Sequence, residues 1–509
     1  MVEEGKQEGA CRDSCRPLKF RIGDREESCD RISELPDALL LHILSFLSVD
    51  DAVLTSLLCR RWRNLWRWMD CLDFPMPCGN LKRNSVHFIG KALALHEGLK
   101  IKRFCARFYY NSKYSSNVDS WVHFAAARNV EKLVLDLFSV ENVAQPYVLP
   151  SCLYTFGSLR ELELNLCHLR PLPSFCLPSL KKLVIANSVF VGETLRDFIS
   201  GCPVIEELVL VNCNQARDLE VVVLNQNLKR MKIVEYPDEL EEATEVKIYA
   251  PHLLQLELHS GEPRSYQIKD VSSIVFACLE IRGMTTCLSI NSSSQKNYHQ
   301  MLESLMAGLH EVRALSLSSW CLQVLPPHDV VHHCLPTPLH HLKHLKVDVR
   351  LDKDELPGIA CLLRNSPNLE RLTIQLFRQG HMDREVEAVG NLSACFSDCG
   401  EENFWNCQSV PFFCLKHNLK KVVVENFKGE DIEISLLKFL LKNACVLEDM
   451  LVYVPARFFI GPAEAYLEYC SEDGRATKKY VNNIRRLLLS PRSSHAEILF
   501  SGRHTICSF

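Results

Sequence analysis

The chain has 509 residues, 47% hydrophobic and 24% charged, a composition typical of folded proteins that excludes wholesale disorder. Lys and Arg number 58 against 62 Asp and Glu, so the formal net charge is −4 and no global basic field exists to attract nucleic acid. No apolar run approaches the roughly 20 residues that a membrane-spanning helix needs. We therefore expect neither nucleic acid nor a membrane as partner.

The head of the chain has no hydrophobic period. Residues 1–29 mix both charge signs with Gly, Ser and Cys, and we expect a flexible leader there. The chain carries 24 Cys, scattered through apolar stretches, and it begins without the apolar core of a secretion signal. Reduced thiols, and with them a location in the nucleus, the cytoplasm or both, fit this usage.

A short helical module is predicted at residues 30–70. Pro36 suits the start of a helix, because its missing N–H would be unpaired in the first turn anyway. Ser48, followed three residues later by Asp51, predicts the capped start of a second helix, and a third element ends near Trp66. So small a unit carries more large apolar side chains than it can bury internally, so the surplus predicts a partner surface.

The segments 32–37, 43–47 and 57–66 of this module resemble the F-box. In that family the three helices bind a Skp-type adaptor, which recruits cullin and RING subunits of a ubiquitin ligase. The adaptor-facing residues implied by the resemblance are Leu35, Pro36, Leu39, Leu40, Ile43, Leu44, Leu57, Trp62, Leu65 and Trp66. An alternative is that the helices only cap the following domain.

The middle of the chain repeats the pattern L-x-x-L-x-L-x-x-(N/C)-x-L, which is complete from Leu159 to Leu169. Further copies of its strand part begin at Val130, Leu180, Ile205, Leu228, Leu253, Phe276, Val312, Leu342 and Leu369. The seven starts from 130 to 276 are 21 to 29 residues apart. This pattern resembles the leucine-rich repeat, in which each unit buries its apolar side against its neighbours. Cys167 and Cys213 are then expected in the core.

Side chains between the Leu positions are expected on a concave face. The resemblance implies that this face binds a protein substrate. The candidate substrate-binding residues are Arg160, Glu163, Asn165, Lys182, Glu207, Arg230, Lys232, Glu257, His259, Lys346 and Arg371. Glu161, Lys181, Glu206, Lys229, Lys343, His344 and Glu370 complete the expected face. Two alternatives are a merely solvated charged surface and a receptor site for a small molecule.

The period is lost at residues 376–410, where we expect a loop, and it returns as a strand at 419–424, a helix at 434–443 and a strand at 447–452. This part, within residues 411–500, resembles the FBD domain of plant F-box proteins. Lys438 and Lys442 are expected on the outer side of the helix.

Two groups of residues were considered as metal ligands, and neither has the paired spacing of common zinc modules. They are Cys395, Cys399, Cys407 and Cys414, and His328, His332, His333 and Cys334. The sequence has no phosphate-binding glycine loop and no nucleophile elbow. We therefore expect no cofactor, no metal and no catalytic residue.

Together these features predict an α/β fold: a three-helix F-box, a leucine-rich-repeat solenoid with a curved parallel sheet at residues 100–375, and an FBD-like α/β cap. The resemblances imply a non-catalytic substrate-recognition subunit of a Skp-cullin-F-box (SCF) ubiquitin ligase. The alternatives are a ligase-independent interaction scaffold and a ligand-sensing F-box receptor.

Overall fold

The fold is described from a computed structural model of the chain. The structure describes residues 34–76, 85–139, 146–169, 175–188, 194–213, 219–222, 226–236, 245–261, 265–269, 273–282, 292–325, 337–377, 412–453 and 497–501, and also Ile32, Leu335, Phe404, Trp405 and Gln408. No helix in these ranges is both long enough and apolar enough to cross a membrane.

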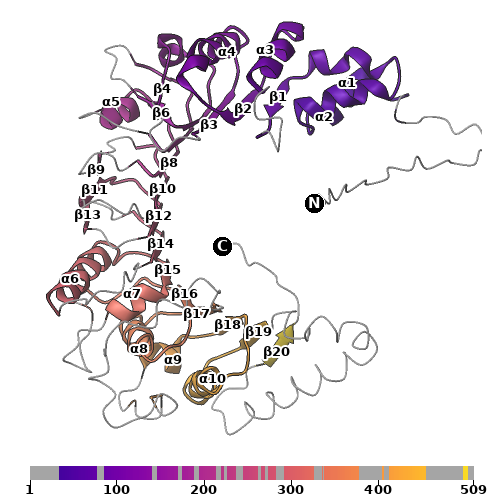
Figure 1. Ribbon diagram of the computed structural model, residues 1–509. Helices are drawn as coiled ribbons and strands as arrows, with labels where there is room; N and C mark the ends of the chain where they lie inside the picture. Colours follow the sequence, from indigo (N-terminus) through magenta and orange to yellow (C-terminus); the bar gives the residue numbers. More distant parts are fainter. Residues whose placement is uncertain are drawn as a thin grey trace, which may run out of the picture.

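A 15-stranded sheet runs through the described chain, and all of its strand pairs are parallel. Figure 1 shows it as an arc whose inner side carries the strands. The strands, in their order in the sheet, are β1 Cys71–Phe74, β2 Arg103–Tyr109, β3 Lys132–Phe138, β5 Glu161–Asn165, β7 Lys182–Ala186, β8 Glu207–Val211, β10 Arg230–Glu235, β12 Gln255–Ser260, β14 Phe276–Ile281, β15 Ala314–Ser318, β16 His344–Val349, β17 Arg371–Leu376, β18 Lys421–Glu425, β19 Asp449–Tyr453 and β20 Glu497–Ser501.

The return segments on the outer, convex side change along the arc (Figure 1). Helices cover the two ends, and a 3-stranded sheet covers the middle. The helices are α3 Ser85–Leu95, α4 Ser115–Ala127, α5 Thr194–Ser200, α6 Ser292–Gly308, α7 Ser319–Val324, α8 Leu356–Asn365, α9 Phe413–His417 and α10 Asp431–Asn443, with 3-10 turns η4 Ser112–Tyr114 and η5 Ser151–Thr155. The small sheets are formed by β9 Leu219–Val222, β11 Glu245–Tyr249 and β13 Ser265–Lys269, and by β4 Tyr147–Val148 with β6 Cys167–His168.

The predicted solenoid is confirmed by the alternation of buried and half-exposed side chains along the strands. In β5, Leu162 and Leu164 are buried while Glu161, Glu163 and Asn165 are partly exposed. The same alternation recurs in β7, β8, β10, β12 and β16. Parallel pairing in register stacks equivalent aliphatic side chains of successive repeats, so one core runs along the whole arc.

One expected repeat is displaced by two residues. We expected Phe276, Leu279 and Ile281 to occupy its three core positions. The register instead pairs Phe276 with Gln255 on the concave face and Ala277 with the core residue Leu256. The core positions of this repeat are therefore Ile274, Ala277 and Leu279, all buried. Because Ala replaces the usual Leu, the pattern search selected the wrong frame.

The sheet is also longer than the predicted array at both ends. It begins at β1 and β2. There Met69, Ile101 and Ala106 occupy positions that leucines fill in later repeats, and they are buried in the same way. At the other end β18 pairs with β17 and β19 pairs with β18, in the same direction. The strand, helix and strand expected near residues 419–452 are confirmed, and they continue the same sheet.

The module before β1 consists of α1 Asp37–Leu44, α2 Val49–Leu54 and the 3-10 helices η1 Thr55–Leu57 and η2 Trp62–Trp68. The Ser48 hydroxyl caps α2 by accepting from the Asp51 amide at 3.1 Å, as expected. The third predicted helix is a 3-10 helix.

Polar contacts join this module to the first repeats. The Arg67 guanidinium donates to the Leu95 carbonyl at 2.8 Å, and Arg103 donates to the Ser45 carbonyl at 3.2 Å. The His96 ring bonds the Met69 carbonyl through Nε2 at 2.8 Å. Burial lowers the pKa of His96, because the imidazolium would lose its hydration there. The module is thus attached to the array through β1 and these side-chain contacts.

Two buried carboxylates organise turns at the C-terminal end of the arc. Glu433, in the first turn of α10, accepts hydrogen bonds from the three amides of residues 428–430 at 2.7 to 3.2 Å. Gly429 supplies the positive φ of 82° that this turn needs. Glu355 binds the amides of residues 350–352 in the same way at 2.7 to 3.2 Å. Each carboxylate therefore satisfies amides that its turn would leave unpaired.

We expect Glu433→Ala to destabilise the chain by about 2–3 kcal/mol, because it leaves these amides without an acceptor. The measurement is the urea midpoint of unfolding. The control is Asp431→Ala in the same turn, whose exposed side chain binds none of these amides and whose loss should cost under about 1 kcal/mol. Equal losses for the two variants would contradict the role given to Glu433.

Candidate protein-interaction surfaces

The residues expected to face a partner on the N-terminal module divide into two groups. Leu40, Leu44, Trp62 and Trp66 are buried within the chain itself, Trp62 with only 4% of its surface exposed. These four expected contact residues are therefore core residues of the module, which is a correction. The reason is that the two Trp residues of η2 and the inward side of α1 close the small core, with α1 in contact with η2.

The other expected residues do lie at the surface. Leu39 and Ile43 are exposed on α1, Leu57 is 83% exposed at the end of η1, and Pro36 is exposed before α1. Leu35 and Leu65 are half-buried against the core. The exposed and the buried residues of α1 lie on different sides of the same helix. The sequence period does not distinguish them, because both sides carry apolar residues.

Seven exposed apolar side chains in and around α1, α2 and η1 are what we call the apolar patch. Its members are Ile32, Leu39, Ile43, Phe46, Leu54, Leu57 and Leu58. Spacings of four and three place Leu39, Ile43 and Phe46 on one side of α1 and its end. Phe46, 74% exposed, and its neighbours Leu54 and Leu58 were not among the expected contact residues. Monomeric proteins rarely leave so many large apolar groups of so short a segment in water, so these residues are suited to binding a partner.

An ion pair holds the module's helices in place. The Arg61 guanidinium binds the Asp37 carboxylate at 2.7 Å and so joins the start of η2 to the start of α1. Asp37 also lies at the N-terminus of its helix, where a negative charge is favourable.

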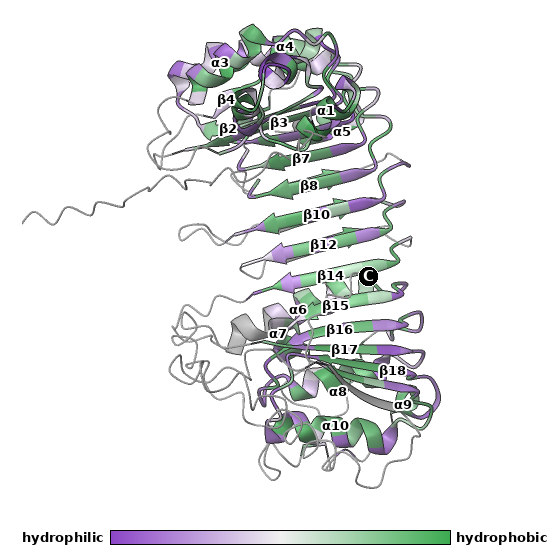
Figure 2. Cartoon of the chain, turned by 90° about the vertical axis from the view of Figure 1, so that its right-hand side faces the viewer, coloured by the Kyte–Doolittle hydropathy of each residue, from purple (hydrophilic) through white to green (hydrophobic). Residues whose placement is uncertain are grey.

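The second surface is the concave face of the sheet, which Figure 2 shows from the open side of the arc. Several charges expected to bind substrate are instead paired with neighbours on the adjacent strand. Lys132 lies 2.7 Å from Glu163, Lys182 lies 2.8 Å from Glu207, and Arg230 lies 3.1 Å from Glu207. From β3 to β10 the face is thus largely neutralised by its own ion pairs.

A row of amides lies where these strands end. The Asn165 amide donates to Asp136 at 2.8 Å, Asn187 donates to Asn165 at 2.8 Å, and Asn212 donates to Asn187 at 3.3 Å. Asn187 and Asn212 have positive φ values of 46° and 48°, which Asn tolerates better than most residues. Asn165, an expected substrate residue, is therefore part of a structural ladder along this edge.

Between the ion pairs and the amides lies an apolar strip that the sequence analysis did not select. It consists of Val184, Ala186, Val209, Val211 and Val234, all half-buried on the concave face. The residues expected on this face from the sequence are charged or polar, and these aliphatic positions are not among them. The signal that identifies the strip is the run from Leu208 to Val211, in which both alternating sets are aliphatic.

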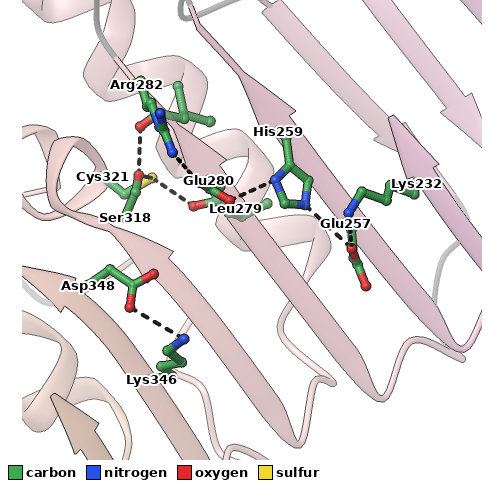
Figure 3. Close-up of polar contacts among 11 residues, drawn as sticks. Lys232, Glu257, His259, Leu279, Glu280, Arg282, Ser318, Cys321, Lys346 and Asp348 are labelled. Atoms are coloured by element: carbon green, nitrogen blue, oxygen red, sulfur yellow. Dashed lines mark hydrogen bonds and ion pairs between the residues drawn. The ribbon is translucent and has the colours of Figure 1, made fainter. Parts of the chain in front are cut away.

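A connected group of polar side chains on the concave face is centred on His259 (Figure 3). Its ring lies 2.7 Å from Glu280 and 3.4 Å from Glu257, and Glu257 in turn lies 3.0 Å from Lys232. Hydrogen bonds that the His259 ring donates to the two carboxylates raise the pKa of His259, and the same hydrogen bonds help lower the pKa of both Glu257 and Glu280 to about 2. This chain of opposite charges connects β10, β12 and β14.

The remaining expected residues lie in different places. Four expected residues do not lie on the concave face: Arg160, Lys181, Glu206 and Lys229. Each lies immediately before the first residue of its strand. These four residues line a hollow of about 440 Å³ together with Pro178, Ser179, Val204 and Asn227. Lys346 and Arg371 lie on the concave face of β16 and β17.

The described residues contain no group of three or more His, Cys, Asp or Glu side chains placed to hold a metal ion. Of the candidates considered, Cys414 is buried and donates to the Leu363 carbonyl at 3.0 Å, and burial raises its thiol pKa to about 12. The other seven candidates lie outside the described residues. Cys167 and Cys213 are buried, which confirms their expected place in the core.

We expect His259→Gln to lower the thermal midpoint most at about pH 5–6. The raised pKa of His259 means that its contribution is present below the unfolded value of about 6.5 and is lost as pH rises through the folded pKa. Glu257 and Glu280 contribute to the stability of the fold in the opposite sense. Their contribution is present above the unfolded pKa of about 4.5 and is lost as the pH falls from there through the folded pKa of about 2. The control is His252→Gln at an exposed position. The coupling would be refuted if the difference in thermal midpoint between His259→Gln and the native chain stayed constant from pH 5 to about 8, or if the control showed the same difference.

Comparison with known proteins agrees with this architecture. The sequence matches the F-box domain family over residues 32–74 and the family described as "At1g61320/AtMIF1, LRR domain" over residues 92–458. Putative F-box/LRR-repeat protein At3g18150 of Arabidopsis thaliana is 31% identical over 445 residues, covering 84% of this chain and 87% of the relative.

Two other relatives from Arabidopsis thaliana are F-box/LRR-repeat protein At5g02910, 33% identical over 69% of this chain and 73% of the relative, and F-box/FBD/LRR-repeat protein At5g22660, 26% identical over 83% and 90%. The names of these relatives contain two parts, the F-box and the LRR repeat. The helical module corresponds to the first part and the repeat array to the second. The chain belongs to the F-box/LRR-repeat family of plants.

Proposed function

We propose that this chain is the substrate-recognition subunit of an SCF-type ubiquitin ligase in the nucleus, the cytoplasm or both. The F-box helices bind a Skp-type adaptor, and the adaptor brings the cullin and RING subunits. The concave face of the repeat array binds the protein to be ubiquitinated. Ubiquitin transfer takes place on other subunits, and this chain contributes proximity, which raises the effective concentration of the substrate near the ubiquitin carrier.

The observation that carries the proposal is the apolar patch on the F-box. Leu57 and Phe46 expose 83% and 74% of their surface although the module has a buried core of its own. Hydrophobic side chains on one helix face are typical of helix-in-groove contacts, and a partner that buries them gains roughly 25 cal/mol per Å² of apolar area. The F-box domain match supports a Skp-type adaptor as that partner.

The position of the two surfaces also supports the proposal. The apolar patch belongs to α1, α2 and η1 at one end of the arc, whereas the concave face extends over the strands that follow (Figure 1). The polar contacts of Arg67, His96 and Arg103 join the F-box to the first repeats. An adaptor bound at the patch therefore leaves the concave face open to a second protein.

We expect the double variant Leu39→Asp, Leu57→Asp to lose co-purification with a Skp-type adaptor. Each carboxylate would be buried without a partner in the interface, and losses at central apolar contacts are about 2–4 kcal/mol, or roughly 30-fold or more in affinity. Both side chains are exposed in the free chain, so the fold should be unaffected.

The matched control for that experiment is Leu99→Asp, which introduces the same charge at a leucine that is 90% exposed and lies outside the patch. It should bind the adaptor like the native chain. Adaptor binding by the double variant, or no binding by the native chain, would contradict the proposed role. Variants of Trp62 or Leu40 are unsuitable, because these residues are in the core.

A further inference from the structure

The concave face changes character beyond the His259 cluster. From β16 to β18 the strand beginnings carry the cationic residues Arg371 and Lys421, which are neighbours in register. The strand ends carry acids, since Asp348 pairs in register with Gln375 and Gln375 with Glu425. This part therefore carries acids toward one edge and bases toward the other, and its ion pairs are longer than those of β3 to β10: Lys346 lies 3.5 Å from Asp348 and Lys421 lies 3.5 Å from Asp449.

Asp348 is the least satisfied acid in this region. Its side chain is only 18% exposed, and its Oδ1 atom is buried and makes no hydrogen bond to the described residues. Lys346 Nζ lies 3.5 Å from that oxygen, beyond ordinary hydrogen-bond length. The hydroxyl of Ser318, the neighbour in register, donates to the Ile281 carbonyl at 2.6 Å. Figure 3 shows the Lys346–Asp348 pair apart from the His259 chain.

A second unsatisfied group lies on the neighbouring strand, one register step from Asp348 along the same face. Thr373 pairs in register with Lys346 and lies on the same face, between Arg371 and Gln375 along β17. Its side chain is buried, with the residue 5% exposed, and its Oγ1 has no hydrogen-bond partner among the described residues. Buried polar atoms in native proteins are nearly always hydrogen-bonded, so two such atoms on adjacent strands point to a missing partner.

The charge around Asp348 indicates what that partner supplies. Glu280 and Glu425 both act on Asp348 electrostatically, and burial together with these negative neighbours raises the pKa of Asp348. Glu280 is already bound to His259 and Arg282, at 2.7 and 2.6 Å. Glu425 makes no ion pair with another described residue, so Lys346 is left as the single cation within ion-pair distance of Asp348 in the described chain. A further positive charge would be favourable here.

We propose that Asp348, Glu425 and Thr373 form a subsite for a cationic side chain, lysine or arginine, of the protein bound on the concave face. The inference rests on the proposed function only in taking that ligand to be a protein. In the free chain Lys346 occupies the position that the incoming cation takes. Its long, flexible side chain can move aside, and a guanidinium brings several donors to a carboxylate and a hydroxyl that lack them.

The test uses the full chain and fluorescein-labelled hexa-arginine, with hexa-citrulline as the neutral probe of the same shape, and measures fluorescence anisotropy. Asp348→Asn should weaken hexa-arginine binding about 10-fold, the effect of one charge-assisted bond. Lys346→Met should strengthen it by about 3-fold or more, because the competing cation is gone. An increase in affinity does not arise from misfolding, so this variant keeps the test decisive.

The matched control is Glu207→Gln, which removes an acid from the same face where it is already bound to Lys182 and Arg230. It should change binding by less than about 2-fold. Equal weakening by Glu207→Gln and Asp348→Asn, weaker binding by Lys346→Met, or binding of hexa-citrulline would overturn the subsite. Because no adaptor is present, a failure of the proposed ligase role leaves this result unaffected, and the reverse also holds.

Discussion

Stacking of buried aliphatic side chains between successive strands is the interaction on which the rest of this structure depends. A single repeat has one apolar side and no means of covering it, so it is stable only when neighbours lie on both sides. Parallel pairing in register places Leu162 beside Leu183 and Leu164 beside Ile185, and so on along the arc. The curved concave face exists because the strands are held side by side while bulkier return segments occupy the outer side.

The same constraint explains how the F-box is attached. Its last helix is followed directly by β1, the first strand of the sheet, so the F-box core and the repeat core form one hydrophobic cluster. Trp62 and Trp66 close the F-box from within, and His96 and Arg103 anchor it through carbonyl groups. The F-box and the repeat array are therefore joined by a short connection and share one hydrophobic core.

Charge on the concave face has two different uses. In the first half of the array the ion pairs join adjacent strands, as Lys182 and Glu207 do, and such half-exposed pairs add modest stability and little net attraction for a ligand. Around β16 to β18 the strand ends carry acids, and the buried Oδ1 of Asp348 has Lys346 Nζ as its nearest cation among the described residues, at 3.5 Å. Recognition of a charged group is therefore better supported there than on the neutralised half.

The sequence by itself determined the repeat period, the F-box, the buried leucines and the return of strand and helix near residues 419–452, because these depend on local spacing of apolar residues. Only the tertiary structure decided that Leu40 is core while Leu39 is exposed, since both belong to one apolar stripe and neighbouring helices choose between them. The frame at Phe276 likewise depended on pairing with β12. Which concave charges are already bound is a property of contacts between strands more than 20 residues apart, such as Lys182 with Glu207, and a single strand's pattern carries no record of them.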